Sequence, residues 1–143
     1  AYISSGMYKE AIASSKQAIK IDPDYADAHN NLGVAYGKSG IYKEAIEAYK
    51  QAIKINPSYA KAHNNLGVAY RESGMYKEAI ASSKQAISID PDYANAHYGL
   101  GATYAFLNDR GSALEQYKIL KSLDSERANK LFNRIINNSG VVE

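Results

Sequence analysis

Residues Ala62–Tyr70 read Ala-His-Asn-Asn-Leu-Gly-Val-Ala-Tyr, and the same nine residues stand 34 positions earlier, at Ala28–Tyr36. In an α-helix, residues spaced i, i+3, i+4 and i+7 share one face, and the stretch places four residues at that spacing: His63, Leu66, Gly67 and Tyr70. Asn64, Asn65 and Val68 fall on the opposite side. We therefore expect a helix that packs with one face and offers two amides and a valine to a partner with the other.

The period of 34 residues extends well beyond this stretch. Residues 26–59 and 60–93 align without gaps and are identical at 24 of 34 positions, and a unit at 94–123 is more divergent. Residues 1–25 match the last part of such a unit. A fixed period of this size is typical of a solenoid, in which each unit stacks on its neighbours. The near-identity favours recent duplication in a natural array, and a consensus-like engineered array is the rival explanation.

Each unit reads as two antiparallel helices. In the unit 60–93 we expect the first helix over Tyr59–Ser73, ended by Gly74 because glycine accepts the left-handed conformation that closes helices. The second helix is expected to begin at Tyr76. Asp90-Pro91-Asp92 ends it because proline cannot continue a helix interior, and Asp92 is expected to cap the next helix.

The end of the chain departs from the repeat. Residues 124–138 predict one more helix, whose apolar residues share a stripe: Ala128, Leu131, Phe132, Ile135 and Ile136. A solenoid needs such a helix to cover the apolar face of its last unit. The sequence therefore predicts an all-α fold, with truncated repeat 1–25, repeats 26–59, 60–93 and 94–123, and a cap helix at 124–138.

Composition excludes several classes of function. The chain of 143 residues has a net charge of +2, which gives no reason to expect nucleic-acid binding. It has no cysteine, which fits a reducing compartment and is also compatible with the bacterial periplasm. No apolar run is long enough for a membrane span. Because the chain begins Ala1-Tyr2 rather than with methionine, we expect a fragment of a longer protein.

The repeat resembles the tetratricopeptide repeat (TPR) family. The first complete unit matches that family's pattern at His29, Leu32, Gly33, Tyr36, Ala45, Tyr49, Ala52 and Pro57, and the second at His63, Leu66, Gly67, Tyr70, Ala79, Ala86 and Pro91. Histidine stands where the family usually has tryptophan, and Ser83 replaces an aromatic residue. The resemblance implies a right-handed superhelix and a non-enzymatic scaffold that binds a peptide or protein segment in a groove lined by the first helix of each unit.

By that resemblance the helix face opposite the packed stripe is the groove wall. The residues expected there are Asp27, Asn30, Asn31, Val34, Lys38, Lys61, Asn64, Asn65, Val68, Arg71, Glu72, Asn95, Tyr98 and Ala102. An amide both donates and accepts, so Asn31 and Asn65 suit the capture of a peptide backbone, whereas solvated helix surface is the alternative reading. Tyr98 and Phe106 either extend the groove or pack under the cap helix. No cofactor or metal is implied, and the three histidines, His29, His63 and His97, are expected to pack.

The truncated first unit suggests a second property. Its apolar side chains would lack a covering helix, and exposed apolar patches usually find partners. We expect either self-association through this end or fraying near residues 1–8. Two alternatives to a peptide-binding scaffold follow from the resemblance: a self-assembling oligomeric scaffold, and the TPR arm of a larger enzyme such as a glycosyltransferase.

Overall fold

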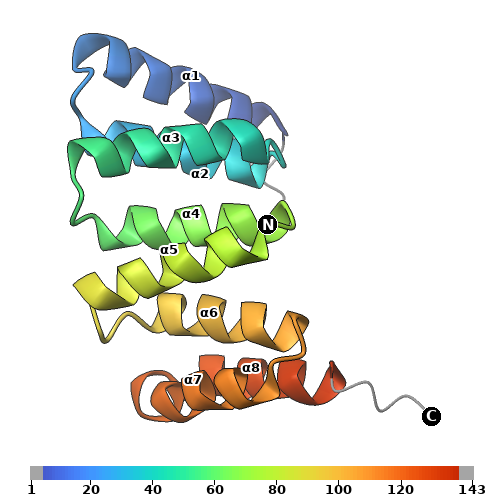
Figure 1. Ribbon diagram of the computed structural model, residues 1–143. Coiled ribbons are helices and arrows are strands. Elements are labelled where there is room, and N and C mark those ends of the chain that lie inside the picture. The colour runs from blue at the N-terminus through green and yellow to red at the C-terminus, as the bar shows by residue number, and fades with distance from the viewer. Residues whose placement is uncertain (1–4, 139–143) are drawn as a thin grey trace.

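The computed structural model describes residues 5–138, and every regular element in that range is an α-helix. The helices stack in chain order from one end of the molecule to the other (Figure 1). Their bounds are α1 (Ser5–Ile21), α2 (Ala26–Lys38), α3 (Tyr42–Ile55), α4 (Ala60–Glu72), α5 (Tyr76–Ile89), α6 (Ala94–Phe106), α7 (Arg110–Leu123) and α8 (Ser125–Asn137).

The stack has two layers of helices. α2 packs on α3, α4 on α5 and α6 on α7, which makes each repeat an antiparallel pair. The first helices of the pairs also approach each other directly, α2 against α4 and α4 against α6, whereas α3, α5 and α7 do not. Because one layer is spaced more closely than the other, the stack curves toward α2, α4 and α6. These three helices therefore form its concave side.

The turns inside the repeats use one backbone conformation. Gly40 and Gly74 have φ of 75° and 77°, the left-handed region in which glycine carries no penalty. Asn108 takes the equivalent place in the third pair with φ of 62°, which asparagine tolerates better than most residues. The predicted stop at Gly74 is confirmed, and the loss of glycine at position 108 leaves the turn unchanged.

The loops between repeats are closed differently from our expectation. Asp92 does not cap α6: Tyr93 is the N-cap residue, and it makes no side-chain capping bond. Instead, the residue before each proline accepts a hydrogen bond from the backbone two positions on, as Asp90 Oδ1 does from Asp92 N at 3.2 Å. Asp22 and Asn56 do the same. The tight turn forms inside the loop because the side chain of Asp90, rather than that of Asp92, reaches a free N–H.

The histidines connect each loop to the helix that follows it. Nε2 lies 2.9 Å from the Pro23 carbonyl in His29, 3.0 Å from that of Pro57 in His63, and 2.7 Å from that of Pro91 in His97. A carbonyl oxygen only accepts, so Nε2 carries the proton in all three rings. His29 and His97 are buried, and the expected packing role of these two residues is confirmed.

The core lies between the two layers and depends on small residues at helix crossings. A Cβ added at Gly33 would stand 2.5 Å from Cε1 of Tyr49, so the Tyr49 ring rests directly on the α2 backbone. Tyr49 is 5% exposed and packs with Leu66 and Tyr70. Burial raises the pKa of Tyr49 to about 12.

The last helix closes the stack as predicted. α8 packs on both α6 and α7, and its Leu131 rests on Gly101 as Tyr49 rests on Gly33. Ala128, Leu131 and Ile135 are buried, whereas the other two residues of the predicted stripe, Phe132 and Ile136, are 38% and 44% exposed. Asp124 caps α8 by accepting from Arg127 N at 3.0 Å.

The first helix has one neighbour. α1 packs against α2 alone among the described helices, and Met7 and Ile21 on it are 55% and 77% exposed. The fraying expected near residues 1–8 is not seen at Ser5–Tyr8, which belong to α1. Residues 1–4 lie outside the described part of the chain.

Candidate functional site

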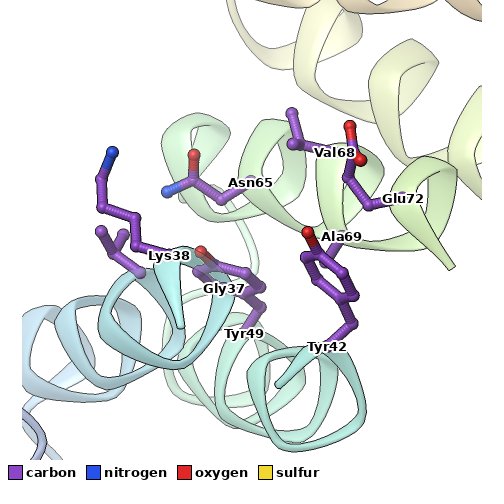
Figure 2. Close-up of a pocket in the computed structure, with 9 residues that line it drawn as sticks. Gly37, Lys38, Tyr42, Tyr49, Asn65, Val68, Ala69 and Glu72 are labelled. Carbon is purple, nitrogen blue, oxygen red and sulfur yellow. The ribbon is translucent and has the colours of Figure 1, made fainter. Parts of the chain in front are cut away.

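A hollow of about 230 Å³ opens on the concave side between α2, α3 and α4. Tyr42 and Tyr49 of α3 reach it from below, and Val68 and Asn65 of α4 stand along one side (Figure 2). Lys38 and Glu72 lie on opposite sides of the opening in that view. The complete lining is Val34, Gly37, Lys38, Tyr42, Tyr49, Asn65, Val68, Ala69 and Glu72. We call this the central hollow.

A second hollow, of about 310 Å³, lies one repeat earlier, between α1 and α2. Its lining is Met7, Tyr8, Ala11, Asn31, Val34, Ala35 and Lys38. Val34 and Lys38 belong to both hollows and form the ridge between them. We call this the α1 hollow. Each hollow thus combines apolar walls with one asparagine, Asn31 in one and Asn65 in the other.

Four of the five asparagines expected in the groove lie on α2 and α4, and these four do not share one environment. Asn31 is exposed and Asn65 is half-buried, so both side chains reach the surface. Asn30 and Asn64 are only 1% and 6% exposed, so the expectation that their amides are open to a ligand is wrong. They point sideways between neighbouring first helices instead, where Asn65 Nδ2 donates to Asn30 Oδ1 at 3.1 Å. This bond ties α4 to α2.

The expected groove charges are largely paired within the protein. Asp27 accepts a 2.7 Å hydrogen bond from the Tyr59 hydroxyl, and burial, followed by that bond, raises the pKa of Tyr59 to about 12. Arg71 folds inward, where its side chain is 17% exposed, and burial lowers its pKa while Glu72 opposes the shift. Lys38 and Lys61 remain exposed.

The groove ends at α6 rather than continuing along it. Ala102, expected on the groove wall, is 1% exposed because α8 packs over that side of α6 and Asn138 Nδ2 donates to the Ala105 carbonyl at 2.7 Å. Tyr98 lies under the guanidinium of Arg134 on α8, at 5.7 Å, and so packs beneath the cap helix. Asn95 is exposed and, with Tyr98, borders a hollow against α8. Phe106 stacks on Tyr76 at 4.7 Å.

Several residues that line the central hollow were not predicted from the sequence. Tyr42 and Tyr49 come from the second helix of the pair, whereas the resemblance directed attention to first helices. Gly37 opens the hollow by having no side chain, and its counterpart one repeat later is Arg71. The glycine at position 37 against arginine at position 71 is visible in the sequence, and it could have indicated that the hollow is open in the first unit.

Comparison with protein-family models places the chain. The TPR repeat model matches residues 1–40, 38–74 and 69–108. The chain therefore belongs to the TPR family, and its helix pairs form the repeat solenoid of that family. TPR arrays are protein-interaction scaffolds, and the partners of this scaffold are proteins or peptides. A comparison with curated protein sequences finds no match.

Solved structures support the same assignment. The crystal structure of MamA is similar at 25% identity with a TM-score of 0.78, over 93% of this chain and 89% of that one. The O-GlcNAc transferase of Thermobaculum terrenum is 27% identical with a TM-score of 0.76, over 82% of this chain but 23% of that one. The TPR2B domain of yeast Sti1, in a complex with pHsp70, shares the fold at 24% identity with a TM-score of 0.74, over 80% of this chain and 95% of that one. Across residues 5–138, no helix is both long and apolar enough to cross a membrane.

Proposed function

We propose that this TPR scaffold binds an extended peptide segment of a partner protein across α2 and α4 and does not itself catalyse a reaction. The observation that carries the proposal is the pair of hollows on either side of the Val34–Lys38 ridge, each with apolar walls and an asparagine. Apolar side chains of the ligand enter the hollows, and the exposed amide of Asn31 bonds its backbone.

The spacing of the hollows selects the shape of the ligand. Packed helices lie about 8–10 Å apart, which sets the distance between equivalent points on α2 and α4. In a polyproline-II segment, side chains three residues apart share one side and lie about 9 Å apart. In a β-strand, side chains on one face lie about 7 or 13 Å apart. A polyproline-II-like ligand with apolar side chains at i and i+3 therefore fits best.

Charge at the hollows favours a neutral ligand. Lys38 and Glu72 at the rim of the central hollow have opposite signs, and Asp27 and Arg71 are engaged within the protein. Affinity should therefore depend on apolar burial and backbone hydrogen bonds, and should change little with salt.

A random-peptide phage library selected on the immobilised protein tests the proposal. Enriched peptides should carry apolar residues three positions apart, and Val68→Asp should weaken them about tenfold or more by placing a charge in the central hollow. Ile119→Asp on α7 is the matched control, because Ile119 is 40% exposed and Val68 36%. No enrichment, or equal binding to the Val68→Asp variant, would contradict the proposal.

Two other roles rest on narrower observations. Met7 and Ile21 on α1 are exposed, which favours self-association through that end of the stack. Light scattering over a concentration series checks this prediction. The likeness to part of the Thermobaculum terrenum O-GlcNAc transferase keeps the role of a TPR arm in a larger enzyme as a candidate.

A further inference from the structure

The hydrogen bond between asparagines is not repeated at the next junction. Asn65 donates to Asn30 between α2 and α4. The residues at the same repeat positions between α4 and α6 are Gly99 and Asn64, and glycine has no amide to donate. Asn64 Oδ1 accordingly has no hydrogen-bond partner among residues 5–138. Asn64 is only 6% exposed, so this acceptor is buried. A buried acceptor without a partner carries a desolvation penalty that a ligand donor would remove.

The missing side chain leaves a polar nook around Gly99. A Cβ built there would stand 3.8 Å from each of three polar atoms: Asn64 Oδ1, Arg71 Nη1 and Ser83 Oγ. Those are ordinary contact distances, so a carbon atom fits at this point without displacing its neighbours. At the preceding junction the corresponding position is occupied by the carboxamide of Asn65.

Arg71 supplies a donor on the other side of the nook. Its Nη1 donates to the Gly99 carbonyl at a long 3.3 Å, and its Nη2 lies 3.9 Å from Glu72. A guanidinium has five N–H groups, so Arg71 can donate to a further acceptor. The nook therefore offers an unpaired acceptor and a cationic donor, and a carboxamide matches both with its NH₂ and its carbonyl.

We propose that the nook at Gly99 is a carboxamide subsite, which accepts the side chain of a glutamine or asparagine of the bound segment in place of the asparagine that the repeat lacks there. The ligand NH₂ donates to Asn64 Oδ1, and the ligand carbonyl accepts from Arg71. This subsite rests on the proposed peptide-binding function and extends it one repeat beyond the central hollow.

The test is a titration of the ¹⁵N-labelled protein with N-acetylglutamine methylamide, followed by NMR. Saturable shifts are expected at the Gly99 amide and at the Asn64 side-chain amide, with a millimolar dissociation constant for so small a ligand. N-acetylmethionine methylamide, which has the same two backbone amides and a side chain of similar length without a carboxamide, should cause no saturable shift at these positions.

Variants decide between a carboxamide subsite and a packing gap. Gly99→Asn supplies the missing amide and should weaken glutamine binding about tenfold or more, whereas Gly111→Asn on α7, where nothing lies within 4 Å, should not. Arg71→Met should weaken it as well and gives an independent reading if the Gly99 variant folds poorly. Equal shifts with the methionine derivative, no saturable shift, or unchanged binding by Gly99→Asn would overturn the subsite and indicate that water alone satisfies Asn64. If the library yields peptides but the glutamine derivative does not bind, the subsite is contradicted and the proposed peptide binding is not. If the reverse occurs, the proposed peptide function fails.

Discussion

The junction between α2 and α4 and the junction between α4 and α6 are built from units of nearly the same sequence but are stabilised differently. At the first, Tyr49 rests on Gly33, Asn65 bonds Asn30, and Tyr59 bonds Asp27. At the second, the corresponding positions hold Ser83, Gly99 and Lys61, and Arg71 occupies the space where Gly37 leaves an opening. A few substitutions in a repeat can therefore replace an apolar hollow at one junction with a polar contact made by an arginine at the next.

The largest effect should come from giving the first junction the residue of the second. Tyr49→Ser removes a ring that is 5% exposed, and truncation of a buried aromatic side chain costs about 3–5 kcal/mol. The free energy of unfolding, from urea titration followed by circular dichroism, measures it. The reciprocal Ser83→Tyr should not recover a comparable amount, because the backbone of α4 already lies close to Ser83 and Arg71 approaches the same point near Gly99. An equal and opposite gain would show that the two junctions are interchangeable.

Replacing the crossing glycine by alanine should also cost more stability at the first junction than at the second. A methyl group at Gly33 would meet the Tyr49 ring at 2.5 Å. One at Gly67 would meet the Ser83 hydroxyl at 2.9 Å, which can rotate away, and the Ala79 carbonyl at 3.3 Å, which needs only a small shift. Gly33→Ala should cost about 2–3 kcal/mol by overpacking, and Gly67→Ala about 1 kcal/mol or less after the gain in helix propensity. Thermal melts of both variants check the order, and a larger loss for Gly67→Ala would contradict it.

Removing the asparagine bond should make the first junction resemble the second. Asn65→Ala leaves Asn30 Oδ1 buried without its donor and should cost about 1–2 kcal/mol in unfolding free energy. Asn31→Ala is the matched control because Asn31 is exposed, and its effect should stay within about 0.5 kcal/mol. Equal effects would mean that the bond adds nothing to the junction.

The last effect is confined to alkaline pH. A tyrosine whose pKa is raised in the folded state adds stability that is complete below its ordinary pKa of 10 and is lost as the pH rises through the folded value. For Tyr59 and Tyr49 that value is about 12, so stability should fall between pH 10 and 12. Tyr59→Phe should flatten this decline, as measured by thermal melts across that range. A decline unchanged in the variant would assign it to other groups.

The architecture could be predicted well from the sequence because the same pattern of apolar and turn residues recurs in every repeat. Apolar spacing, the stop at Gly74 and the final amphipathic helix each depend on local chemistry that recurs at a fixed period. The groove was predicted less well because its openness depends on neighbours. Nothing local to Asn30 shows that Asn65 will cover it, and nothing local to Ala102 shows that α8 will pack over it. Helical periodicity assigns a residue to a face, whereas burial depends on what packs against that face.

The position of α8 determines how this array can be engineered. Because α8 rests on α6 through Leu131 and Gly101, a repeat appended after residue 138 would find the α6 face already occupied. A 34-residue unit inserted between residues 59 and 60 would instead be flanked by helices like those that now meet there. The array should therefore be lengthened by inserting units internally, with α1 and α8 left unchanged.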